Sequence, residues 1–214
     1  MAPHGHGKCC GDQAAAHSHD EGEQGIQYSL YAKINKEDLE CLNETTEGSG
    51  KLVFKPWEDR LNFDTYVESD VDEELLFNIP FTGNVKLKGI KVIGGDEDSH
   101  PARMRIFKNR PGMTFDEAAS EADQEFELVK DSTGVAEYAT KIVIFQNVHH
   151  LTLHFPRNFG AEKTKIYYIG LKGEWSEAHH HGVTICTYEA RPMADDHPHK
   201  SHLDDIHSPP SVGS

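Results

Sequence analysis

Residues Glu68 to Gly94, ESDVDEELLFNIPFTGNVKLKGIKVIG, form the stretch that decides the fold. Leu75, Phe77 and Ile79 alternate with residues of the opposite parity, which is typical of a half-buried strand. The pair Gly83-Asn84 follows, and both residues tolerate positive φ at low cost. The pattern therefore predicts an apolar hairpin with its turn at this pair, placed in the middle of the protein.

The returning strand changes phase at Gly89. Val85 and Leu87 share one parity, whereas Ile90 and Val92 share the other. A glycine at a change of phase predicts a β-bulge that bends the strand. The acidic residues before the hairpin are expected at its solvated entrance, namely Glu68, Asp70, Asp72, Glu73 and Glu74.

Length and charge limit the classes of function. The chain has 214 residues and a formal net charge of -15. Phosphate binding relies on clustered Lys and Arg, so direct nucleic-acid binding is not expected, whereas a basic protein partner fits the charge. No apolar run reaches the ~20 residues of a membrane span, and the N-terminus lacks the apolar core of a signal peptide. We expect a monomer in the cytoplasm, with the nucleus as a second compartment.

Cysteine use indicates no redox chemistry and no structural metal. The four cysteines include a vicinal pair, Cys9-Cys10, and two isolated residues, Cys41 and Cys186. In a cytosolic chain they are expected to be reduced thiols. Neither a CxxC motif nor a Cys/His framework for zinc is present, so no cofactor is expected.

Composition divides the chain into three parts. Residues 1–25 carry Gly, His, Ala and acidic residues without any aromatic or branched apolar residue, which predicts a disordered tail. Residues 191–214 have a similar composition, and we expect a second disordered tail there. The folded domain is predicted to span residues 26–190.

About eight strands are expected within the domain. Asn35 caps a predicted helix that runs to about Leu42, and residues 115–123 are predicted to form either one or two helical turns or a long loop. Short alternating segments separated by turn residues predict an all-β fold, an antiparallel jelly-roll β-sandwich with short helical segments. The remaining strands are expected at residues 52–57, 104–109, 125–129, 141–148, 150–155, 165–175 and 183–190.

Several long blocks of this sequence resemble the PITH domain. They are CLNE, EGSGKLVFKPWEDR, the stretch quoted above, DSHPARMRIFKN, YIGLKGEW and VTICTYEA, and they cover nearly all of residues 26–190. The resemblance implies a galactose-binding-domain-like jelly roll similar to the Doc subunit of the anaphase-promoting complex, and association with the 26S proteasome. The thioredoxin module that precedes this domain in some relatives is absent, so its disulfide chemistry is not carried over.

Several histidines are candidate ligands of a metal ion. His150 and His154 share a strand face with His149 beside them, and His179, His180 and His181 follow in a loop. Cys9 and Cys10 stand in the first tail, with His4, His6, His17 and His19. Zinc catalysis needs three oriented ligands and an acid or base, which one sequence does not establish. We therefore predict no metal site, and these side chains are expected to be solvated.

Catalytic motifs are absent from the sequence, so no catalytic residue is assigned. There is no GxSxG and no Cys/His nucleophile signature. An alternative class of function is a jelly-roll binder of sugar or metal, or an enzyme using the same face. Exposed aromatic residues would then serve as platforms, the candidates being Trp57, Trp175, Tyr167 and Tyr168, although core packing is the commoner fate of such residues.

The preferred site is a protein-binding patch. It combines Trp57 as an aromatic anchor with Glu58 and Asp59, flanked by Lys55 and Arg60, and with the acidic run Glu68, Asp70, Asp72, Glu73 and Glu74. The alternative is a Trp57 buried beneath a loop. The predicted function is a non-enzymatic adaptor or regulator that docks on a protein partner, which the resemblance indicates to be the 26S proteasome, with indirect effects on protein turnover or gene expression.

Overall fold

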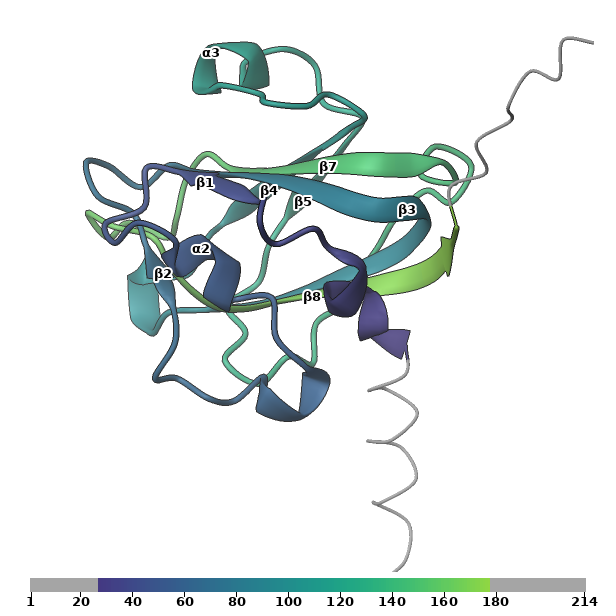
Figure 1. Ribbon diagram of the computed structural model, residues 1–214. Helices are drawn as coiled ribbons and strands as arrows, with labels where there is room; N and C mark the ends of the chain where they lie inside the picture. The colour runs from purple at the N-terminus through teal and green to yellow at the C-terminus, as the bar shows by residue number, and fades with distance from the viewer. Residues whose placement is uncertain (1–26, 178–214) are drawn as a thin grey trace, which may run out of the picture. The chain divides into compact units, whose positions relative to one another are not determined.

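Strand β3 (Leu75–Gly94) belongs to two antiparallel layers and joins them (Figure 1). The structure is a computed structural model and describes residues 27–177. One layer holds its first half with β1 (Glu40–Leu42), β7 (Val148–Phe155), β4 (Arg103–Lys108) and β5 (Gln124–Glu127). The other holds its second half with β8 (Lys165–Ser176), β2 (Val67–Glu68) and β6 (Tyr138–Ala139). The predicted antiparallel jelly-roll β-sandwich is confirmed.

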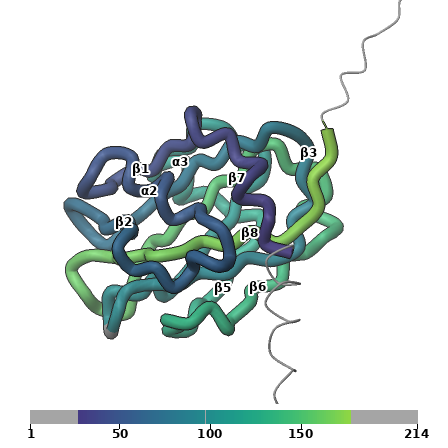
Figure 2. The backbone as a smooth tube through the Cα atoms, turned by 60° about the horizontal axis from the view of Figure 1, so that its bottom comes forward, coloured from purple at the N-terminus to yellow at the C-terminus, as the bar shows by residue number. Residues whose placement is uncertain are grey.

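Helical segments are short and lie outside the layers. They are η1 (Ser29–Lys33), α2 (Ser49–Leu52), η2 (Trp57–Asp59), η3 (Glu97–Ser99) and α3 (Phe115–Ala118). Figure 2 shows η1 beside β8. A capping box between Thr114 and Glu117 begins α3, which satisfies amide groups at its first turn. Within residues 27–177, no helix is long and apolar enough to cross a membrane.

The predicted hairpin at Gly83-Asn84 is wrong, because the chain bends there without reversing. Leu75 to Pro80 pair with β7, and Asn84 to Gly94 pair with β8. Neither residue of the pair has positive φ. A Cβ at Gly83 would lie 2.5 Å from Nε1 of Trp175 and 2.6 Å from the carbonyl oxygen of Ser176. Glycine is needed here for close approach to β8, and the bend carries β3 from one layer to the other.

The predicted bulge at Gly89 is confirmed. The register with β8 passes from Leu87 opposite Gly173 to Gly89 opposite Lys172, which leaves one extra residue on β3. Residues of both parities are consequently buried on β3, and Val85, Leu87, Ile90 and Val92 are at most 1% exposed. The bulge therefore keeps both parts of the strand facing the core.

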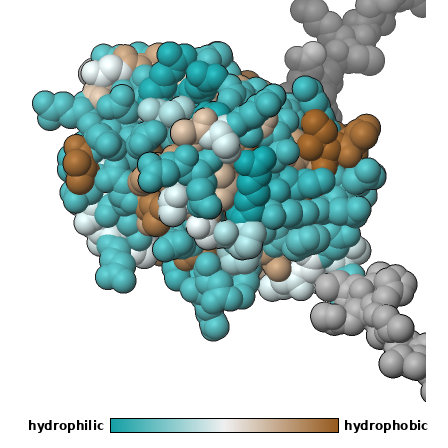
Figure 3. All heavy atoms as spheres, turned by 90° about the horizontal axis from the view of Figure 1, so that it is seen from above, coloured by the Kyte–Doolittle hydropathy of each residue, from teal (hydrophilic) through white to brown (hydrophobic). Residues whose placement is uncertain are grey.

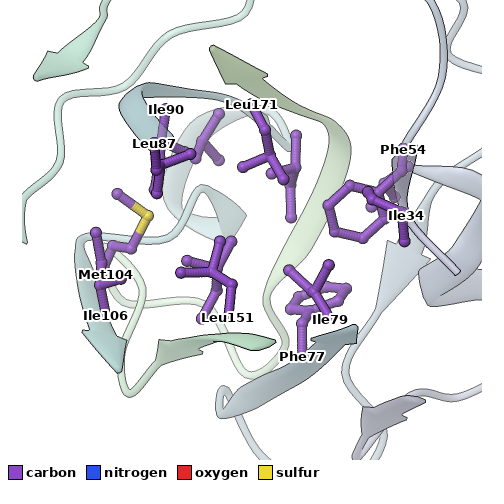
Figure 4. Packing of buried hydrophobic residues seen from close by; sticks show 14 of the residues in the cluster. Ile34, Phe54, Phe77, Ile79, Leu87, Ile90, Met104, Ile106, Leu151 and Leu171 are labelled. Carbon is purple, nitrogen blue, oxygen red and sulfur yellow. The ribbon is translucent and has the colours of Figure 1, made fainter. Parts of the chain in front are cut away.

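The core lies between the two layers (Figure 4). Phe77 packs edge-to-face against Phe54 and Phe155, with ring centroids 5.9 Å apart in each pair. Leu87, Ile90 and Leu171 face this group from the other layer. Burial of one such side chain contributes about 1.5–3 kcal/mol, so these contacts stabilise the sandwich.

Three other predicted elements are wrong. Residues 35–42 form no helix, because the Asn35 side chain accepts the Glu37 amide in a turn (3.2 Å) and Cys41 then pairs with Phe77 of β3. Residues 52–57 form no strand and instead cover the core with Val53 and Phe54. In residues 141–147 a turn replaces the strand, and Phe145 alone is buried there. Residues 52–57 and 141–147 therefore contribute buried apolar side chains from segments outside the strands, whereas residues 40–42 pair with β3 as the short strand β1.

The other predicted strands are present with shifted ends. β4, β5, β7 and β8 match the predicted segments, and Met104 and Ile106 share the buried face of β4. Of the two options for residues 115–123, the structure has one short helix, α3, followed by a loop. The predicted strand at residues 183–190 and the two predicted tails lie outside the described residues.

Candidate protein-interaction site

Trp57 lies in a buried aromatic cluster, which is the second of the two alternatives that the sequence left open. Its side chain is 4% exposed and stacks on Tyr28, with ring centroids 5.1 Å apart. Tyr168 meets it edge-on at 6.2 Å, and the Arg60 guanidinium lies 4.1 Å from the ring. A ring so covered offers a partner almost no surface, and its contribution is to hold η2 on β8.

Glu58 and Asp59 are exposed on η2, but the acidic run makes its contacts elsewhere. Glu68 forms an ion pair with Lys165 of β8 at 3.1 Å, and Asp70 lies 3.8 Å from Lys163. Trp57 and the acidic run are therefore anchored by different residues. Because Trp57 is buried, it does not provide the exposed anchor of the predicted patch.

Within the acidic run, Asp72 and Glu74 have structural contacts. The Oδ1 atom of Asp72 accepts hydrogen bonds from Nδ2 of Asn43 (2.8 Å) and from the Glu74 amide (3.0 Å). The Oε1 atom of Glu74 lies 3.1 Å from Nε2 of the buried His154. Burial, together with Asp72 and Glu73, raises the pKa of Glu74. The expected solvated position holds for Asp70 and Asp72, whereas the Glu74 carboxylate reaches into the protein.

The exposed aromatic residues lie one loop further along the chain. Phe63 and Tyr66, from the segment between η2 and β2, are 47% and 40% exposed. Both meet Tyr167 of β8 edge-on, with centroids 4.9 Å and 5.9 Å apart. The Lys165 ammonium lies 4.5 Å from the Tyr66 ring centroid. We call Phe63, Tyr66 and Tyr167 the aromatic patch.

Lys55 holds the segment that carries the aromatic patch. Its ammonium group is largely buried and donates hydrogen bonds to the carbonyl oxygen of Asn62 (2.6 Å) and to Oγ1 of Thr65 (2.9 Å). Burial lowers the pKa of Lys55, while the carboxylates of Asp59 and Asp64 act in the opposite direction. The loop is thus pinned from beneath, which keeps Phe63 and Tyr66 at the surface.

A hollow of about 220 Å³ lies beside Tyr66. Its lining includes the side chains of Leu52 and Tyr66, two carboxylates from Asp64 and Glu68, and hydroxyl groups from Thr45 and Thr46. A second, acidic hollow of about 730 Å³ is also lined by residues of the segment 44–52, including Glu44 and Glu47. The rest of its lining includes Glu37, Asp38 and Glu40. Apolar, aromatic and anionic groups therefore meet within one region of the surface.

Other exposed apolar side chains are scattered. Val71, Val135 and Val143 are at least 80% exposed, and each stands in a different loop. The face shown in Figure 3 is mainly hydrophilic, with separate hydrophobic groups. Scattered residues of this kind are normal on a soluble surface. The aromatic patch differs because two exposed rings, Phe63 and Tyr66, both contact a third, Tyr167.

The described residues contain no group of three or more His, Cys, Asp or Glu side chains arranged to hold a metal ion. His149 is exposed as expected, but the expected solvated position of His154 is wrong, because His154 is buried beside Glu74. Cys41 is a free thiol. The remaining histidines and cysteines proposed as ligands, at residues 4–19, 179–181 and 186, lie outside the described residues.

The aromatic platforms considered for a sugar do not form one surface. Trp57 and Tyr168 are buried, and the Lys33 ammonium lies 4.1 Å from the Trp175 ring centroid. Tyr167 alone among the four belongs to the aromatic patch. Sequence reasoning missed Phe63 and Tyr66, although two aromatic residues in a polar segment without strand or helix periodicity were an available signal.

Comparison with known proteins gives a family and a set of relatives. A family model described as PITH domain matches residues 20–192. A PITH domain-containing protein of Drosophila pseudoobscura pseudoobscura is 62% identical over 201 residues, covering 92% of this chain and 95% of the relative. PITH domain-containing protein 1 of Homo sapiens is 57% identical over 195 residues, covering 91% of each chain. A solved family 32 CBM from C. perfringens NanJ, in complex with galactose, is 9% identical with a TM-score of 0.46, covering 65% of this chain and 97% of that one.

Proposed function

The chain belongs to the PITH domain family, and from this premise we propose that it is a non-enzymatic protein-interaction module that docks a partner through the aromatic patch. The observation that carries the proposal is the contact of Phe63 and Tyr66 with Tyr167 at the surface. Tyr, Trp and Phe are enriched at the centres of protein interfaces, because rigid rings bury much area at low entropic cost.

The surroundings of the aromatic patch favour a basic partner surface. Asp64 stands between its two loop aromatics, and Glu68 and Asp70 follow on β2 and the loop after it. Exposed acidic groups around an aromatic centre would steer a cationic surface toward it, and the net charge of -15 adds to this field. Glu58 and Asp59 on η2 extend the acidic surroundings in this proposal.

The partner that we propose is the 26S proteasome, with the chain acting as an adaptor or regulator. This partner follows from the resemblance to the proteasome-interacting PITH domain. In the same proposal the chain acts as a monomer in the cytoplasm and the nucleus. Effects on protein turnover or gene expression would then be indirect.

A binding assay with purified 26S proteasome tests the proposal. We expect the full chain to be captured, and Phe63→Ser to weaken capture at least tenfold because the central ring of an interface is lost. Phe159→Ser is the matched control, since Phe159 is also a partly exposed ring but lies in the loop between β7 and β8. Both variants should retain the melting temperature within a few degrees.

Two outcomes would contradict the proposal. One is no capture of the proteasome by the unaltered chain. The other is equal capture of both phenylalanine variants, which would place the binding surface elsewhere. Stabilisation of the chain by galactose or another simple sugar, abolished by Phe63→Ser, would instead favour the alternative that the patch binds a small ligand.

A further inference from the structure

The 220 Å³ hollow beside the aromatic patch has the lining of a receptor for a cationic side chain. Leu52 and Tyr66 supply apolar surface, and Asp64 and Glu68 supply carboxylates. The threonine hydroxyl groups add neutral acceptors. A long side chain with an aliphatic stem and a charged end matches this combination, because its stem packs on apolar surface while its end meets anions.

The charge in the hollow is only partly neutralised by the protein itself. Glu68 is paired with Lys165 at 3.1 Å. The Asp64 carboxylate, within residues 27–177, has no hydrogen bond or ion pair, and it acts on Lys55 through space. Asp64 therefore remains available to an incoming cation.

Lys165 shows that a cation is stable beside this ring. Its ammonium lies 4.5 Å from the centroid of Tyr66 while it pairs with Glu68. Tyr66 and Glu68 also line the hollow. Aromatic face and carboxylate together are the combination that binds cationic side chains in proteins.

We propose that this hollow receives an arginine side chain from a basic segment of the docked partner, a proposal that rests on the interaction function above. Arginine fits better than lysine because its planar guanidinium stacks on an aromatic ring and offers five donors to several acceptors at once. A lysine ammonium has three donors and is more strongly hydrated, so it gains less from this lining.

The second hollow supports a segment with more than one cation. Residues of the short segment 44–52 line both hollows, with Thr45, Thr46 and Leu52 in the first and Glu44, Glu47 and Lys51 in the second. Glu44 is already used, because its carboxylate accepts the Gly48 amide at 2.5 Å and the Gly50 amide at 2.6 Å. Glu37 and Glu47 are exposed and remain for a second basic side chain of the same segment.

The test uses the full chain and a fluorescein-labelled, capped peptide that carries two arginines in a glycine-serine background. Anisotropy at low salt is compared for this peptide and for versions with lysine or citrulline. We expect the arginine peptide to bind more tightly than the lysine peptide, and the citrulline peptide not to bind. Asp64→Asn should weaken arginine binding about tenfold, and Glu37→Gln with Glu47→Gln should weaken it less.

Glu121→Gln is the charge-matched control, because Glu121 is exposed in the loop after α3 and should leave peptide binding unchanged. Equal binding of the arginine and citrulline peptides, or equal affinities of the Asp64→Asn and Glu121→Gln variants, would overturn the proposal. The outcome is separable from that of the docking proposal, because Phe63 does not line the hollow. Proteasome capture lost in Phe63→Ser but kept in Asp64→Asn would leave docking standing and remove the arginine site.

Discussion

The Nε2 atom of His154 lies 3.1 Å from Oε1 of Glu74, so a buried histidine of β7 holds the end of the acidic run. Burial, and to a smaller extent the Arg105 guanidinium, lower the pKa of His154 from 6.5 to about 4. At neutral pH the imidazole is therefore uncharged and donates a hydrogen bond to the carboxylate. The unfolded chain takes up a proton on this residue at a higher pH than the folded chain does.

We predict that His154 makes the protein less stable as pH falls from 6.5 toward 4. The stabilising contribution is fully present above pH 6.5, and its loss at pH 5 amounts to ~2 kcal/mol. The loss is measured as the difference between the free energies of unfolding in urea at pH 7.5 and pH 5. His154→Gln, which keeps an amide donor for Glu74, should lose less stability over this interval than the parent.

The pH dependence of stability in the variant must be compared with that in the parent, because other groups with shifted pKa values also contribute to it. Burial also lowers the pKa of His100 and of His150, and the raised pKa of Glu74 acts in the opposite direction. His149→Gln is the control, since His149 is an exposed histidine of the same strand. Parallel pH profiles for the parent and the His154→Gln variant would show that this imidazole does not contribute.

Phe77→Ala should cost ~3–5 kcal/mol of unfolding free energy, because it removes a fully buried ring that packs against Phe54 and Phe155. Domains of this kind are typically stable by about 5–15 kcal/mol, so the variant would be close to unfolding. Chemical denaturation followed by tryptophan fluorescence measures the loss. Phe159→Ala, at a partly exposed ring, should cost less than ~1 kcal/mol, and equal costs would contradict the assignment of Phe77 to the core.

Gly83→Ala tests whether glycine at this position serves close approach or a turn. We expect a loss of ~1–3 kcal/mol, because the new methyl group would meet Trp175 and the carbonyl oxygen of Ser176. Gly83→Asn should cost more, since asparagine is larger. At Gly112, where φ is +64° and the space is open, asparagine should be tolerated better than alanine. If alanine is tolerated better than asparagine at both positions, or asparagine better than alanine at both, this account is contradicted.

Alternation and phase predicted much of the fold, but not the path of β3. The parity change at Gly89 identified the bulge correctly, because the bulge moves buried residues from one parity to the other. The Gly83-Asn84 pair was misinterpreted because a glycine demanded by close packing is indistinguishable in sequence from one demanded by positive φ. Only the position of Trp175 decides between them, and that contact joins residues far apart in the chain.

The site shows a similar division. A Trp beside charged residues is typical of an interface, so the sequence favoured an exposed Trp57. In the structure, Tyr28 and Tyr168 from distant segments cover Trp57. Phe63 and Tyr66 lie in a polar segment without periodicity, and what makes them a patch is Tyr167 of β8. Exposure of an aromatic residue depends on such tertiary neighbours, which residue type alone does not reveal.

The acidic run can be separated into residues that stabilise the fold and residues that face a partner. Asp70→Asn with Glu73→Gln should change the unfolding free energy by less than ~1 kcal/mol, because the ion pair lost within residues 27–177 is the exposed one between Asp70 and Lys163. Asp72→Asn should cost more, about 1–2 kcal/mol, because it alters the acceptor of both the Asn43 amide and the Glu74 backbone amide.

Capture of the proteasome by the Asp70→Asn, Glu73→Gln double variant then tests the steering role of the run. We expect weaker capture and a flatter dependence on salt, because two charges that attract a basic surface are gone while the fold is intact. Glu121→Gln with Glu162→Gln removes the same charge from two other exposed positions and should have a smaller effect. If both double variants weaken capture equally, net charge alone accounts for the attraction. If neither does, the run only solvates this end of the sandwich, and capture depends on the aromatic patch alone.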